Sequence, residues 1–181
     1  MLAIVDYGVG NLFSLKSSLD AIGVESVITG DADTIEGAEK VILPGVGAFS
    51  DAVAKLIESG LFDLIVRLSK EGKPIMGICL GMQLLFDKSF EYGEHDGLGL
   101  IQGNVSPIKA TIKEDLKIPH MGWNALTLTK KDDKLFKYIK DGDHVYFVHS
   151  YYATDCDESI IATAEYGTTI TASSCVHNNL Y

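Results

Sequence analysis

The stretch that decides the fold of this chain is Lys73-Pro74-Ile75-Met76-Gly77-Ile78-Cys79-Leu80-Gly81-Met82-Gln83-Leu84-Leu85-Phe86. A run from Ile75 to Ile78 that is apolar on both faces is typical of a buried parallel strand, and Pro74 fits the first position of a strand. The apolar residues from Leu80 to Phe86 recur at helical spacing. The stretch therefore predicts a strand-to-helix corner with Cys79 at its apex.

The spacing Gly77-x-Cys79-x-Gly81 is the thiol counterpart of the nucleophile elbow Gly-x-Ser-x-Gly, whose tight turn requires small neighbours. In such an elbow the residue after the nucleophile, here Leu80, directs its backbone N–H at an oxyanion. A helix that begins at Cys79 would also favour the thiolate through its positive N-terminal end. The pattern predicts a cysteine nucleophile, and a small buried cysteine that merely ends a strand is the alternative.

Length and composition predict one domain with a sizeable core, because 46% of the 181 residues are hydrophobic. The three cysteines, Cys79, Cys156 and Cys175, are widely spaced, which argues against a disulfide scaffold and a structural zinc site. We expect no metal and no cofactor. Neither a signal peptide nor an apolar stretch long enough to span a bilayer is visible, so we expect a cytoplasmic protein. A formal net charge of −10 opposes binding to nucleic acid phosphates.

Upstream of the elbow the chain alternates predicted strands and helices. We expect strands at Leu2 to Asp6, Val24 to Thr29 and Val41 to Leu43, a helix capped by Asn11, a short turn or helix at Thr34 to Ala38, and a helix capped by Ser50. Gly8-Val9-Gly10 resembles the start of a dinucleotide-binding fingerprint, but Phe13 stands where the third glycine belongs. A dinucleotide site is therefore not expected.

The loop Pro44-Gly45-Val46-Gly47 follows one of these strands directly. Its two glycines would allow a ligand to approach the backbone, and an ordinary strand-to-helix loop is the alternative. In an open α/β sheet, ligands bind at the carboxyl ends of the strands, where both this loop and Cys79 would lie. We therefore predict that the two features share one site.

Downstream of Phe86 the chain becomes rich in predicted strands, with one short helix around Lys134 to Ile139. The strand candidates are Val105 to Ile112, Ala125 to Thr129, His144 to Tyr152, Ile160 to Tyr166 and Thr169 to Val176. The segment Ile118 to Asn124 reads as a loop that places the only tryptophan, Trp123, on a binding surface or in a local aromatic cluster. The predicted fold class is α/β, an open, mostly parallel twisted sheet flanked by helices, with a β-rich C-terminal half.

Four motifs in this order resemble those of the triad-type (class I) glutamine amidotransferases, and within them the glutaminase subunits of imidazole glycerol phosphate synthases. They are Pro44-Gly45-Val46-Gly47, Gly77-Ile78-Cys79-Leu80-Gly81-Met82-Gln83, Pro119-His120-Met121-Gly122-Trp123-Asn124 and Tyr146-Phe147-Val148-His149-Ser150-Tyr151. The opening Asp6-Tyr7-Gly8-Val9-Gly10-Asn11-Leu12 fits these subunits too. The similarity runs over residues 1–181, which would form a single glutamine amidotransferase domain.

The resemblance implies a role for each matching residue. Cys79 would attack the side-chain amide of L-glutamine, release ammonia and form a glutamyl thioester that water hydrolyses to glutamate. The backbone N–H groups of Val46 and Leu80 would form the oxyanion hole. The substrate-holding positions would be Gly45, Gly47, Gln83, Glu91, Ser150 and Tyr151.

The resemblance also implies a partner, a (β/α)₈-barrel synthase subunit that receives the ammonia in a heterodimer. The barrel would use it on a phosphoribosyl-type intermediate of histidine biosynthesis, giving imidazole glycerol phosphate and a purine-pathway carboxamide. The positions facing this partner would be Gly10, Asn11, Trp123, Asn124 and Tyr146.

One departure from the family concerns the base. Relatives carry a later Phe-His-Pro-Glu-Lys motif whose His is the general base and whose Glu orients it, and this sequence reaches Tyr181 without it. Asn178-Asn179 reads as a hairpin turn that would lead into the missing strand. We therefore expect the 181-residue chain to be inactive or severely impaired as a glutaminase.

Three other interpretations remain open from the sequence. The chain could feed a pyridoxal phosphate, anthranilate or carbamoyl phosphate synthase instead. It could be a non-catalytic scaffold that binds the barrel partner, which the missing His and Glu would fit. It could also be a stress-type cysteine protein of related α/β fold, although such a protein has no need for Pro44-Gly45-Val46-Gly47.

Overall fold

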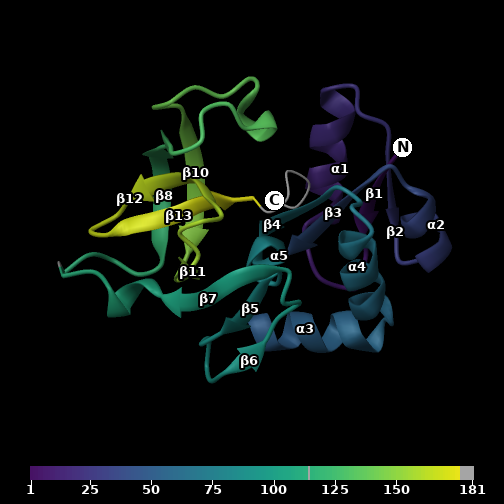
Figure 1. The fold of residues 1–181 in the computed structure, drawn as a ribbon, viewed down its shortest axis with the longest axis horizontal. Coiled ribbons are helices and arrows are strands. Elements are labelled where there is room, and N and C mark those ends of the chain that lie inside the picture. The colour runs from purple at the N-terminus through teal and green to yellow at the C-terminus, as the bar shows by residue number, and fades with distance from the viewer. Residues whose placement is uncertain (114, 176–181) are drawn as a thin grey trace.

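The structure, a computed structural model, describes residues 1–113 and 115–175. It has two halves, one of strands alternating with helices and one built almost entirely of strands (Figure 1). The first half consists of β1 (Leu2–Val5), α1 (Leu12–Ala21), β2 (Ser26–Thr29), α2 (Ala32–Gly37), β3 (Lys40–Gly45), α3 (Phe49–Glu58), α4 (Leu61–Lys70), β4 (Ile75–Cys79) and α5 (Leu80–Gln83). None of the helices in the described residues could span a membrane.

The first half is built on a four-stranded, fully parallel sheet with the order β2-β1-β3-β4. On one face of the sheet, Val5 of β1 and Leu43 of β3 belong to a buried cluster with apolar residues of α3 and α4. On the other face, Ile4 and Ile42 are also buried. Burial on both faces explains why these strands read as unbroken apolar runs rather than alternating ones.

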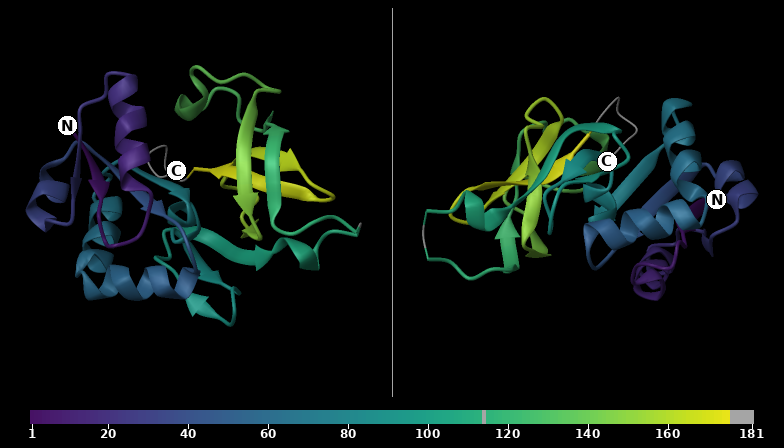
Figure 2. Two further views of the ribbon diagram at one scale, coloured as in Figure 1. Left: turned by 180° about the vertical axis from the view of Figure 1, so that it is seen from behind. Right: turned by 90° about the horizontal axis from the view of Figure 1, so that it is seen from below.

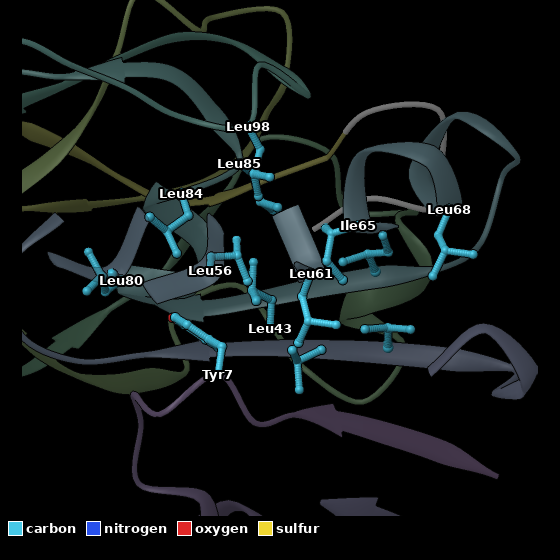
Figure 3. Close-up of a cluster of buried hydrophobic side chains, with 14 of the residues drawn as sticks. Tyr7, Leu43, Leu56, Leu61, Ile65, Leu68, Leu80, Leu84, Leu85 and Leu98 are labelled. Carbon is cyan, nitrogen blue, oxygen red and sulfur yellow. The ribbon is translucent and has the colours of Figure 1, made fainter. Parts of the chain in front are cut away.

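Leucines dominate this core, and the loop and elbow of the predicted site rest directly on it. Figure 3 shows Leu80 and Leu84 of the elbow segment beside Leu43 and Leu56, with Tyr7 under them. Leu80, Leu84 and Leu85 are each at most 3% exposed. Burying a leucine side chain contributes about 1.5–3 kcal/mol, so the segment after Cys79 is firmly anchored.

The second half consists of three small sheets. Their elements are β5 (Phe86–Ser89), β6 (His95–Asp96), β7 (Ile101–Pro107), β8 (His120–Ala125), β9 (Thr127–Leu128), β10 (His144–His149), β11 (Tyr151–Thr154), β12 (Ile160–Glu165) and β13 (Thr169–Ser174), with the 3₁₀ turns η1 (Ile108–Ala110) and η2 (Lys134–Phe136). The strand orders are β11-β7-β5-β6, β13-β12-β9 and β10-β8. Both views in Figure 2 place β4 and α5 on the side of the parallel sheet that faces these strands.

The predicted fold class is confirmed, and several predicted elements are corrected. The helix after Cys79 ends at Gln83, and Phe86 already begins strand β5. The segment expected as a loop around Trp123 is strand β8, because it pairs along its whole length with β10. Ser50 does not cap α3, which begins at Phe49 after Ala48. The predicted turn at Asn178-Asn179 and the end of the last strand at Val176 lie outside the described residues.

Candidate functional site

Cys79 sits at the end of β4 with φ 57° and ψ −118°, a backbone conformation that a residue with a side chain rarely adopts. Two glycines make the corner possible. A Cβ atom at Gly77 would run into the backbone of Met82, and one at Gly81 would run into the carbonyl of Leu43. The elbow predicted from the spacing of these residues is therefore present, with its strain located on the cysteine.

The loop after β3 lies directly beside this corner. In the parallel register of β3 and β4, Gly45 is the partner of Cys79. Val46 is 52% exposed, and Gly47 has φ +93°, a conformation that favours glycine. The glycine loop and the cysteine lie at the same edge of the sheet, because neighbouring parallel strands end together there. That they form one site stays a prediction.

Gly45 itself is buried in the strand rather than open to a ligand. A Cβ atom there would lie 2.6 Å from the backbone nitrogen of Gly81 and 2.9 Å from Cβ of Leu80. The absent side chain therefore lets β3 approach α5 closely. This close packing explains why position 45 is a glycine, and no contact between Gly45 and a substrate is needed.

The Cys79 residue is exposed, yet its thiol is crowded. Burial raises the pKa of the Cys79 thiol above its usual value, and a hydrogen bond from the backbone N–H of Leu80 opposes this shift as the smaller effect. The expectation that a helix would tip Cys79 toward the thiolate is wrong for the described residues. The physical reason is burial, which is the larger effect on the Cys79 pKa. The Leu80 N–H is directed at the Cys79 sulfur.

A pocket of about 250 Å³ lies between the elbow and the strand-rich half. Cys79 and Gln83 line one side, and Tyr146, His149 and Tyr151 line the other. Nε2 of Gln83 donates a hydrogen bond of 3.1 Å to the carbonyl oxygen of Tyr151 and so ties α5 to the start of β11. The structure therefore brings Cys79, Gln83 and Tyr151 together from segments that are far apart in the sequence.

Glu91 lies beside the N-terminus of α3. Its Oε2 accepts a hydrogen bond of 2.6 Å from the backbone N–H of Phe49, the first residue of α3. This carboxylate fulfils the capping role that Ser50 was expected to have, and a negative charge suits a helix N-terminus. Burial raises the pKa of Tyr151, and the charge of Glu91 adds to that shift, which places the two side chains in one electrostatic environment.

Ser150 does not line the 250 Å³ pocket. It is half-buried between β10 and β11, and its carbonyl oxygen accepts a hydrogen bond of 2.9 Å from the backbone N–H of Ile108. Val46, Gly47 and Glu91 do not line this pocket either. Of the predicted substrate positions, Gln83 and Tyr151 therefore line the pocket, whereas Gly45, Gly47, Glu91 and Ser150 do not.

The residues predicted to face a partner fall into two groups. Gly10 and Asn11 lie in the loop before α1, where a Cβ atom on Gly10 would lie 3.3 Å from the Pro44 ring and Asn11 accepts a hydrogen bond from the N–H of Ser14. Trp123 and Tyr146 pair across β8 and β10 with ring centroids 5.6 Å apart, and they are 68% and 52% exposed. The exposure of Trp123 fits the binding-surface interpretation, and its ring contact with Tyr146 shows that it also packs locally.

Asn124 alternates to the inner face of the same ribbon. There its side chain bonds to His120 and to the carbonyl oxygen of Glu165 rather than to solvent. Sequence reasoning treated His120 and His149 only as members of motifs. Their direct pairing in the register of β8 and β10 could not be seen before β8 was recognised as a strand.

Comparison with known proteins fits this geometry. The family model for glutamine amidotransferase class-I matches residues 3–181. The chain belongs to the class-I glutamine amidotransferase family. It is 49% identical over 173 residues to the imidazole glycerol phosphate synthase subunit HisH of Caldanaerobacter subterraneus subsp. tengcongensis, with 95% of this chain and 83% of that protein covered. The HisH of Sulfurimonas denitrificans is 46% identical, with 99% and 86% covered.

At such identity the chain belongs, within the class-I family, to the HisH subunits of imidazole glycerol phosphate synthase. Solved structures show the same fold at low sequence identity. The structure of PurLQS from Thermotoga maritima matches with a TM-score of 0.71 at 19% identity, covering 99% of this chain and 83% of that one. A glutamine amidotransferase matches with a TM-score of 0.68 at 18% identity, covering 90% and 84%.

Proposed function

We propose that residues 1–181 form one glutamine amidotransferase domain that hydrolyses L-glutamine to glutamate and ammonia and supplies the ammonia to a (β/α)₈-barrel synthase subunit. The barrel would make imidazole glycerol phosphate from it. The observation that carries the proposal is the strained elbow of Cys79 beside the loop after β3, in a chain of the HisH group. The relatives compared above are HisH subunits, which supports this synthase over the alternative ones.

In the proposed reaction, Sγ of Cys79 attacks the side-chain amide carbon of glutamine, and the carbon–nitrogen bond breaks to release ammonia. Water then cleaves the thioester and restores the thiol. The backbone N–H groups of Leu80 and of exposed Val46 would hold the oxyanion. Each such donor typically lowers the barrier by about 2.7–4 kcal/mol.

The proposed substrate contacts use the groups around this centre. Gln83 and Tyr151 line the pocket, and the Glu91 carboxylate would attract the α-ammonium group of the substrate. Gly47 and Ser150 would bind through their backbones, and Gly45 would contribute by keeping β3 close to α5.

The proton of the thiol needs an acceptor, and His149 does not fit this role. It lines the same pocket, but Nδ1 and Nε2 are both hydrogen-bonded to other partners. Across residues 1–113 and 115–175, none of the hydrogen bonds joins a histidine to the Cys79 thiol. His149 is therefore not proposed as the base.

The decisive experiment labels the protein with a glutamine-mimicking electrophile, such as a chloroketone or diazoketone analogue, and maps the adduct by mass spectrometry. We expect the adduct on Cys79 and slower labelling with excess glutamine but not with excess asparagine. Buried Cys156 and Cys175 serve as internal controls. Labelling of either control, or a rate that glutamine leaves unchanged, would contradict the proposal.

The proposed partner surface is the outer face of β8 and β10 together with Gly10 and Asn11. Its support is the exposed Trp123–Tyr146 pair, since exposed aromatic residues of this kind often dominate binding energies. Trp123→Ala should weaken binding to a barrel subunit by about 2 kcal/mol or more, measured by calorimetry. Tyr138→Ala is the matched control, because Tyr138 is an aromatic residue that is 85% exposed outside this surface. Equal affinities for the two variants would exclude this surface.

We also propose that the protein works in the cytoplasm. Cys79 and Cys156 are free thiols, which a reducing compartment maintains.

A further inference from the structure

A continuous chain of hydrogen-bonded groups runs along the inner face of β8 and β10 to the pocket beside Cys79. Nδ2 of Asn124 donates to the carbonyl oxygen of Glu165 at 2.9 Å, and Oδ1 of Asn124 lies 2.8 Å from Nε2 of His120. Nδ1 of His120 lies 2.9 Å from Nε2 of His149. Nδ1 of His149 lies 2.8 Å from the carbonyl oxygen of Tyr151.

The groups at the two ends of this hydrogen-bonded series determine where its protons lie. A carbonyl oxygen only accepts, so the one on Tyr151 requires a proton on Nδ1 of His149. At the other end, the carbonyl of Glu165 requires the NH₂ group of Asn124, which turns the amide oxygen toward His120. That oxygen in turn requires a proton on Nε2 of His120.

With only one proton on each ring, His120 and His149 could not form a hydrogen bond with each other. Nδ1 of His120 and Nε2 of His149 would face each other at 2.9 Å with two lone pairs and no hydrogen. Turning over the amide of Asn124 does not help, because it sets two oxygens against each other at Glu165. All the contacts are satisfied only if the histidine pair carries one additional proton.

The surroundings indicate which ring holds this proton. Burial lowers the pKa of His149, the carbonyl of Tyr151 opposes this as a smaller effect, and His120 adds to the lowering. Burial does not distinguish the two rings, because His120 is also buried; the aromatic contacts of His120 do. His120 is 1% exposed and stacks between Tyr166, at a centroid distance of 4.0 Å, and Phe147, at 5.1 Å. A cation is stabilised by the faces of aromatic rings.

Two titratable side chains near the pair are engaged in other hydrogen bonds. The hydroxyl of Tyr166 donates to the carbonyl oxygen of Lys117 at 2.7 Å, and the carboxylate of Glu165 accepts from the Thr169 hydroxyl at 2.7 Å. On the pocket side, the ionisable groups of the lining are the Cys79 thiol and the phenols of Tyr146, Tyr151 and Tyr152.

We propose that His120 is an imidazolium that donates from both ring nitrogens and, through neutral His149, positions the Tyr151 carbonyl at the wall of the substrate pocket. His149 and Gln83 both donate to this oxygen, at 2.8 Å and 3.1 Å, so it joins β10, β11 and α5 just after Cys79. Loss of the additional proton would make the His120–His149 contact repulsive and loosen this junction. The role in substrate binding rests on the proposed glutaminase function, whereas the charge of His120 does not.

The charge is tested on the unaltered protein by NMR with ¹⁵N-labelled histidine. At pH 7 we expect both ring nitrogens of His120 to carry protons and His149 to carry one, on Nδ1. One proton on each ring would overturn the proposal. This measurement needs neither turnover nor glutamine, so its outcome is independent of the proposed function.

The positioning role is tested by His120→Gln, with His144→Gln as the matched control on the exposed edge of β10. The readout is the glutamine concentration that halves the labelling rate of Cys79, measured from pH 6 to 9. We expect it to be at least tenfold higher in His120→Gln and to lose its pH dependence, while the control matches the unaltered protein. Equal values and equal pH profiles for both variants would refute the positioning role. If His120→Gln does not fold, or glutamine protects no variant, the NMR result alone decides the proposal.

Discussion

Replacing Gly45 by alanine tests whether the close approach of β3 to α5 holds the elbow in place. The added Cβ would lie 2.6 Å from the nitrogen of Gly81, 2.9 Å from Cβ of Leu80 and 3.0 Å from the carbonyl carbon of Leu80, where ordinary contact begins at 3.4 Å. The closest pair must therefore separate by 0.8 Å. Two of these atoms are backbone, so no side chain can rotate away, and α5 or β3 must move.

Overpacking of this kind costs about 1–3 kcal/mol, so we expect Gly45→Ala to lower the free energy of unfolding in urea by that amount. The displaced α5 should also move the Leu80 N–H from the sulfur and slow electrophile labelling of Cys79. Gly37→Ala is the matched control, because Gly37 in α2 has nothing within 4 Å of an added Cβ and should be neutral or slightly stabilised. Identical urea midpoints for the two variants would refute the reasoning from close packing.

Three further predictions concern groups around the site. Tyr7→Phe removes the hydroxyl that donates to the Pro44 carbonyl at 2.7 Å and should lower the free energy of unfolding in urea by about 1–3 kcal/mol. Tyr138→Phe on the surface should leave that free energy unchanged, and equal losses for the two variants would contradict this prediction. Glu91→Gln removes the charge at the N-terminus of α3 and should lower the free energy of unfolding by about 0.3–1 kcal/mol. Glu58→Gln at the other end of the helix should not lower it, and the opposite order of the two variants would exclude the capping role. Because burial raises the Cys79 pKa, its alkylation rate should keep rising above about pH 8.5, the ordinary cysteine pKa, and a plateau near pH 7 would contradict the inferred crowding.

The predicted and observed structures differ where pairing partners decide the local conformation. The segment around Trp123 contains glycine and asparagine, which favour a loop, but its pairing with β10 makes it strand β8. The helix after Cys79 was expected to continue through Leu84 and Phe86. It ends at Gln83 because Leu84, Leu85 and Phe86 are buried in the core and Phe86 pairs with β7 as the first residue of β5.

The corrected cap of α3 has a similar cause. Ser50 is a favoured capping residue by type, but the N-terminus of the helix is satisfied by Glu91, 42 positions away from Phe49 in the chain. Local sequence rules cannot find a cap that arrives from another element. The His120–His149 pair was missed for the same reason, since its members are 29 positions apart and meet only across β8 and β10.

The sequence by itself determined the elbow and the loop that faces it. Gly77 and Gly81 leave room for the tight turn at Cys79. Apolar runs separated by helices place the elbow and the loop at one edge of a parallel sheet. Only the tertiary structure decided which residues from the second half close the pocket and how its histidines share their protons. Those properties depend on contacts between distant strands, whose register is set by the packing of the whole chain rather than by any local run of residues.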